Sequence, residues 1–231
     1  MEIRVGTSGF SYKEWKGRFY PEDLPNDDML GYYAERFRAV EINNTFYGMP
    51  SENVLDRWME QVPDRFRFVL KAHRQITHFK RLKDAALQPM EYLWSKARLL
   101  DHRLGPLLLQ LPPNLKKDVP RLDAFLGRAP AGMRAAVEFR HESWLDDEVY
   151  DTLRRHGAAL VIAQTQESET PLVPTADWGY LRLRKVAYEP GEVAEWAERV
   201  KAQDWSEAYV FFKHEDEATG PRLAREFMER L

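Results

Sequence analysis

The 231-residue sequence contains no cysteine. That absence excludes disulfide bonds, thiolate zinc sites and cysteine nucleophiles, and it is typical of proteins from a reducing compartment. Long apolar runs are also missing, so the sequence predicts no membrane-spanning helix. Residues 1–4 lead into a strand-like run without the basic and apolar segments of a secretory signal. We therefore expect a cytoplasmic protein with no membrane partner.

A large excess of charge of either sign is missing as well. The formal net charge is −3, and 44% of the residues are hydrophobic, which suffices for a packed core. A slightly negative net charge does not attract nucleic acid to the protein as a whole. Nucleic acid is therefore an alternative partner that the composition does not favour. Nothing in the composition indicates an oligomeric state.

A glycine-rich phosphate-binding turn is absent from the first strand. Residues 6–9 read GTSG and lack the third glycine and the spacing of the dinucleotide-binding motif. This argues against an open doubly wound sheet, and no motif in the chain indicates a bound cofactor.

Short apolar runs alternate with helical patterns along the whole chain. Eight runs rich in apolar residues are strand candidates, and most are as continuously apolar as strands of a parallel sheet covered on both faces. They span residues 3–9, 39–47, 67–73, 106–112, 134–141, 159–165, 179–184 and 208–214. Between them lie amphipathic stretches such as Leu30, Tyr33, Ala34 and Phe37, which share one helical face. Residues 166–177 are polar and contain two prolines, so a loop replaces the helix after strand six. The pattern predicts an α/β fold, a single (β/α)8 TIM-type barrel over residues 1–231.

Polar side chains recur at the carboxyl ends of these predicted strands, as Gln164 does on the sixth. Glu138 and Arg140, and likewise Arg182 and Arg184, are two residues apart, which places each pair on one side of its strand. We expect that side to face into the barrel, where charges must pair with one another or bind a ligand. Active sites of this fold lie at the same end. The alternative is that inward Arg–Glu pairs neutralise each other and have only a structural role.

The charges predicted at this end are mostly positive. Five cations, Lys71, Arg140, Arg182, Arg184 and Lys213, stand against Glu41 and Glu138. A cationic pocket in an acidic protein suggests a small anionic substrate with phosphate or carboxylate groups. The sequence therefore predicts an enzyme with Glu41, Glu138 and Lys71 as catalytic residues. The predicted substrate-binding residues are Asn43, Tyr47, His73, Gln110, Arg140, His141, Trp144, Arg182, Arg184 and Lys213.

Two other functions stay open from the residues alone. A metal-dependent hydrolase or lyase acting on nucleic acid would draw its ligands from Glu41, His73, Glu138, His141 and His214. The basic residues Arg74, His78, Lys80, Arg81 and Lys83 would then contact phosphates. The other function is a non-catalytic anion-binding module.

Aromatic residues of the first loop, from Phe10 to Tyr20, are expected to form a lid over the barrel mouth.

Five segments together resemble one known family. They are GTSGFSY (6–12), WKGRFYP (15–21), VEINNTFY (40–47), LQLPP (109–113) and VEFRHESW (137–144). Their combination is similar to the YecE-like family, domain of unknown function 72, and this resemblance implies a TIM-type barrel without an established activity. The chain departs from the common pattern at Arg184-Lys185, where many relatives have His-Gly, and at Lys213-His214, where many have paired asparagines. Both departures add positive charge.

Overall fold

A computed structural model describes residues 1–213 and 216–231, so His214 lies outside the described residues. Within them, eight strands form a closed barrel in chain order, and every neighbouring pair is parallel. The strands are β1 (Glu2–Ser8), β2 (Ala39–Ile42), β3 (Arg67–Lys71), β4 (Leu104–Gln110), β5 (Ala135–Glu138), β6 (Ala159–Gln164), β7 (Trp178–Leu183) and β8 (Glu207–Phe212). The predicted TIM-type barrel is confirmed.

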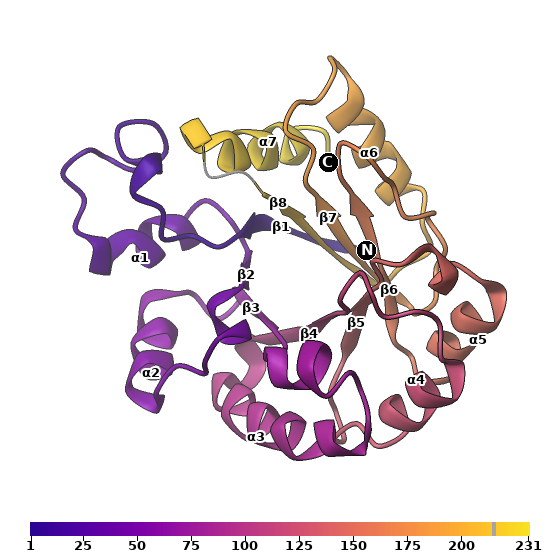
Figure 1. Cartoon of the computed structure of the whole chain (residues 1–231). Helices are drawn as coiled ribbons and strands as arrows, with labels where there is room; N and C mark the ends of the chain where they lie inside the picture. Colours follow the sequence, from indigo (N-terminus) through magenta and orange to yellow (C-terminus); the bar gives the residue numbers. More distant parts are fainter. Residues whose placement is uncertain (214–215) are drawn as a thin grey trace.

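Helices surround the barrel on its outer side (Figure 1). They are α1 (Met29–Ala34), α2 (Glu52–Gln61), α3 (Leu87–Ala97), α4 (Val119–Leu126), α5 (Asp147–Arg155), α6 (Glu192–Lys201) and α7 (Thr219–Met228). All residues from 165 to 177, between β6 and β7, are described and contain no helix, which confirms the predicted loop. In the described part of the chain no helix has the length and apolarity needed to cross a membrane.

Several strands end earlier than predicted. The run predicted as a strand over 39–47 leaves the sheet after Ile42 and turns through a 3-10 helix at Asn44–Phe46. The Thr45 hydroxyl is within hydrogen-bonding distance of the carbonyl oxygens of Ile42 and Lys71, at 3.0 and 2.7 Å, and ties this turn to β3. Asn43, His73, Arg140 and Arg184 therefore lie in loops directly after their strands, at the barrel mouth.

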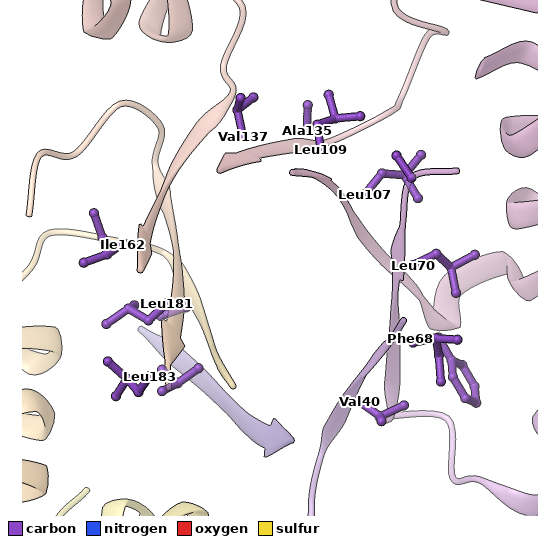
Figure 2. Close-up of a cluster of buried hydrophobic side chains, with 14 of the residues drawn as sticks. Val40, Phe68, Leu70, Leu107, Leu109, Ala135, Val137, Ile162, Leu181 and Leu183 are labelled. Atoms are coloured by element: carbon purple, nitrogen blue, oxygen red, sulfur yellow. The ribbon is translucent and has the colours of Figure 1, made fainter. Parts of the chain in front are cut away.

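The strands separate two apolar clusters. Leu181 and Leu183 belong to the outer cluster, whose side chains point from the strands toward the helices (Figure 2). Tyr180 and its neighbours Tyr209 and Phe211 belong to the inner cluster, which fills the barrel. Because side chains alternate along a strand, the residues in phase with Tyr180 point inward, Arg182 among them.

The aromatic residues of the first loop form part of the outer core. Trp15, Phe19 and Tyr20 are buried, and Phe19 contacts the rings of Tyr33 and Phe37 beside α1. The prediction of a lid over the barrel mouth was wrong for these residues. Burial of their large apolar area against α1 offers more stabilisation than exposure above a charged opening.

Gly6 allows β1 and β2 to approach closely. A Cβ atom at this position would lie 1.9 Å from the Ala39 carbonyl oxygen, a backbone atom that cannot rotate away. We predict that Gly6→Ala lowers the free energy of unfolding by about 3 kcal/mol, the upper end for an overpacked site. Urea denaturation measures this, with Gly48→Ala as the control, because a Cβ at Gly48 meets nothing within 4 Å. Equal stability of the two variants would contradict the packing argument.

Candidate functional site

Arg182 occupies the centre of the barrel mouth and binds two carboxylates. Its Nε and Nη2 atoms donate to both oxygens of Glu41 at 2.9 and 2.7 Å, while its Nη1 atom donates to Glu138. All three side chains are almost fully buried. The guanidinium thus bridges β2, β5 and β7 across the barrel.

Glu41 accepts hydrogen bonds at both oxygens from other groups as well. Ser8 and Tyr180 donate their hydroxyl protons at 2.7 Å, and the Asn43 amide donates at 3.2 Å. Burial alone raises the pKa of this carboxyl, but the Arg182 charge and these hydrogen bonds reverse the effect, so the pKa lies below its ordinary value. Glu41 is therefore a fully engaged carboxylate.

Glu138 is the second anion and has more cations around it. Its Oε1 atom accepts from Gln110 at 2.9 Å, from Arg184 at 3.1 Å and from Arg140 at 3.2 Å. Against the effect of burial, Arg182, Arg184 and Arg140 lower the pKa of Glu138 to about 2. It is therefore ionised at neutral pH.

Lys71 is connected to this group through Gln110. Its Nζ atom donates to Gln110 Oε1 at 2.8 Å and lies 4.5 Å from the centre of the Phe46 ring. Within the described residues no carboxylate lies within ion-pair distance of Nζ. Burial and the nearby Arg182 lower the pKa of Lys71 to about 8, although Glu41 and Glu138 act in the opposite direction.

We call these side chains the mouth network: Glu41, Lys71, Gln110, Glu138, Arg140, Arg182 and Arg184. The network contains four cations and two carboxylates. At the opposite end of the barrel, Arg4 and Arg134 pair with Glu2 and Glu207, and Arg67 lies close enough for the charges of Arg4 and both glutamates to act on it. The mouth differs in that one carboxylate, Glu138, is shared among three arginines.

A pocket of about 300 Å³ opens beside Glu138. It is lined by Pro113, Glu138, Phe139, Arg140, Ala163, Thr165, Glu167, Ser168, Thr170 and Arg184. The Arg184 Nε atom is buried and has no hydrogen-bond partner among the described residues. An unpaired buried donor beside a pocket is a group that a ligand can satisfy.

The other predicted substrate-binding residues lie apart from the network. His73 donates from Nε2 to the Tyr47 carbonyl oxygen at 3.1 Å and accepts the Gln75 amide at Nδ1, so both ring nitrogens are engaged. Tyr47 itself is 67% exposed, at the edge of the mouth. The His141 ring accepts the Ser143 amide in a local turn. Lys213 is exposed beyond the end of β8.

Trp144 and Gln164 correct the sequence interpretation. Trp144 is 1% exposed, stacks on Phe139 and donates its indole N–H to the Leu115 carbonyl oxygen at 2.7 Å. It is a core residue, because its apolar ring is buried and its polar N–H group has a hydrogen-bond partner inside the protein. Gln164 was expected at the mouth, but it faces α6, where it accepts from Trp196 Nε1 at 3.0 Å.

The candidate metal ligands do not converge. In the described ranges 1–213 and 216–231, no group of three or more histidine, aspartate or glutamate side chains is placed to hold a metal ion. Glu41 and Glu138 are instead bound to Arg182, and His73 is bound to backbone groups.

Sequence reasoning missed Tyr180 and the small residues of the pocket wall. Tyr180 precedes Arg182 by two positions, and this spacing would have predicted that both side chains point into the barrel. Thr165, Ser168 and Thr170 belong to the loop that replaces a helix, and no local pattern relates them to Arg184.

Glu138→Gln tests the network. A carboxyl whose pKa falls from 4.5 to about 2 on folding stabilises the native state above pH 4.5, and that contribution is lost as pH falls toward 2. We predict that Glu138→Gln reduces the free energy of unfolding at pH 7 by about 3 to 5 kcal/mol, because it leaves buried cations underpaired. The variant should also show a weaker loss of stability between pH 4.5 and 2.

Denaturant unfolding monitored by circular dichroism at several pH values measures both effects. Glu60→Gln, an exposed position on α2, is the control and should match the wild type. An unchanged acid dependence in Glu138→Gln would contradict the described ion pairing.

The chain matches a family model and two curated relatives. The model described as "Protein of unknown function DUF72" matches residues 4–231. UPF0759 protein YecE of Escherichia coli K12 is 35% identical over 128 residues, which cover 54% of this chain and 47% of that protein. UPF0759 protein YunF of Bacillus subtilis is 23% identical over 157 residues, 64% of this chain and 54% of that protein. The matched region spans about half the length of these relatives.

Solved structures agree with the family match. A DUF72 family protein of Thermotoga maritima has a TM-score of 0.85 at 30% identity, covering 99% of this chain and 98% of that chain. SacUVDE has a TM-score of 0.56 at 13% identity, with 99% and 98% covered, and shares the fold alone. With a family match over nearly the whole sequence and a similar fold throughout, the chain belongs to the DUF72 family, as the sequence segments predicted.

Proposed function

We propose that this protein is an enzyme that binds a small phosphorylated or carboxylated molecule at the barrel mouth. The observation that supports this is the charge imbalance of the mouth network, four cations against two carboxylates. Both carboxylates are already bound to Arg182, so the surplus charge has no counterion within the network. A bound anion would supply it.

Arg184 and Arg140 are the proposed anion-binding residues. Both line the pocket of about 300 Å³, and the buried Arg184 Nε lacks a partner among the described residues. A guanidinium presents a planar set of donors that matches the oxygens of carboxylate and phosphate groups. Their common acceptor, Glu138 Oε1, holds the two guanidinium groups beside each other.

The two glutamates have a positioning role in this proposal. Their oxygens accept hydrogen bonds from several donors, and their lowered pKa values keep them ionised at neutral pH. A catalytic group that gains or loses a proton during turnover needs a pKa near the working pH, which favours Lys71, whose pKa is about 8, as the catalytic residue. Lys71 therefore distinguishes the enzyme from a module that only binds anions.

Binding of inorganic phosphate and of oxalate, measured by isothermal titration calorimetry, tests the proposal. We predict that Arg184→Gln weakens binding about ten- to a hundredfold, the range for a lost hydrogen bond to a charged group. Arg18→Gln is the matched control, because Arg18 is exposed and its ion pair among the described residues is with Glu217 on the surface. Absence of binding to the wild type, or equal affinity in Arg184→Gln, would refute an anion site at the mouth.

A further inference from the structure

We infer that Lys71 is an amine nucleophile that forms an imine with an aldehyde or ketone carrying a carboxylate or phosphate group. The inference rests on the proposed function, since the anionic group would be held by Arg140 and Arg184. It adds the substrate class, a carbonyl compound, and the bond that forms.

The surroundings of Lys71 differ from those of three lysines that pair with glutamates. Lys185, which is also partly buried, donates to both oxygens of Glu192 at 2.7 and 2.8 Å. Lys96 and Lys201 also pair with glutamates, at 2.6 Å each. Lys71 instead donates to a neutral amide and faces an aromatic ring. Nothing in its described surroundings ties the amine to an anion, so its lone pair becomes available when one proton is lost.

The anion-binding groups lie within a short distance of this amine. Gln110 accepts from Lys71 Nζ at one end of its amide and donates to Glu138 Oε1 at the other, at 2.8 and 2.9 Å. The same Glu138 oxygen accepts from Arg140 and Arg184. Lys71 and the two arginines are therefore linked through Gln110 and Glu138, and in this inference a ligand of a few carbon atoms places its charged group on the arginines and its carbonyl carbon near Nζ.

Burial of Lys71 favours the neutral amine and lowers its pKa. Of the nearby charges, Arg182 and Arg140 also oppose protonation, whereas Glu41 and Glu138 favour it. The resulting pKa of about 8 leaves a substantial neutral fraction at neutral pH, whereas an ordinary lysine is almost entirely protonated. His78, the nearby titratable ring, has a pKa lowered by burial and by Lys71, so it adds no charge at this pH.

The proposed step is a condensation without oxidation or reduction. The Nζ lone pair attacks the carbonyl carbon, the carbonyl π pair moves to oxygen, and this oxygen takes up a proton while nitrogen loses one. The carbinolamine hydroxyl then leaves as water with a second proton, as the nitrogen lone pair forms the C=N bond. One amine and one carbonyl give one protonated imine and one water, with a net uptake of one proton.

Reductive trapping tests this inference. The intact protein is incubated at pH 8 with glyoxylate or with glycolaldehyde phosphate, which separate the carboxylate and phosphate sources, and sodium cyanoborohydride reduces any imine. Peptide mass spectrometry then measures the labelled fraction of each lysine. We predict that Lys71 is labelled at least about tenfold faster than Lys185, because a lower pKa leaves more neutral amine. Uncharged glycolaldehyde should label Lys71 more slowly than the two anionic aldehydes do, because Arg140 and Arg184 cannot hold it.

Two variants serve as controls. Lys71→Arg should remove the fast-labelled site while a thermal melt shows an intact fold, and Lys185→Arg should leave labelling of Lys71 unchanged. Labelling of Lys71 no faster than that of Lys185, or equally fast with uncharged glycolaldehyde, would overturn the inference. If phosphate or oxalate still binds in that case, the anion site stands and only the imine is refuted, whereas loss of both refutes the proposed function as well.

Discussion

The architecture of the barrel mouth depends on one buried guanidinium. Arg182 binds Glu41 from β2 and Glu138 from β5 while belonging to β7, so three strands across the barrel share one ionic contact. Two buried carboxylates without it would repel each other and face a large desolvation cost. Because Glu138 is fixed in this way, Gln110, Arg140 and Arg184, which donate to it, are positioned as well.

The second consequence is the way in which charge is shared at the mouth. Within the described residues Glu138 is shared among three arginines, and Lys71 has a neutral amide as its hydrogen-bond acceptor. Underpaired buried cations lower the stability of the folded state. The proposed anionic ligand would supply the missing counterion.

Arg140 has two effects in the proposed mechanism. It provides donors for an anionic group, and together with burial and Arg182 it lowers the pKa of Lys71 so that the amine can react near neutral pH. A carboxylate beside Lys71 would increase local pairing, but it would also hold the amine in its protonated form. The neutral Gln110 positions the lysine without that penalty and connects it to Glu138.

The sequence alone determined the eight strands, the missing helix after strand six and the inward direction of Glu41, Glu138 and Arg182, because apolar runs and a period of two are local properties. It did not determine where strands end, since turns such as that at Thr45 depend on contacts with a neighbouring strand. It placed Trp144 and Gln164 at the mouth, whereas tertiary packing assigned Trp144 to the core and turned Gln164 toward α6. Only the closed barrel decided that Arg140 and Arg184 share one oxygen of Glu138 and that Lys71 donates to a neutral amide. It also decided which loop forms the pocket wall. These residues come from segments far apart in the chain, so no local pattern relates them.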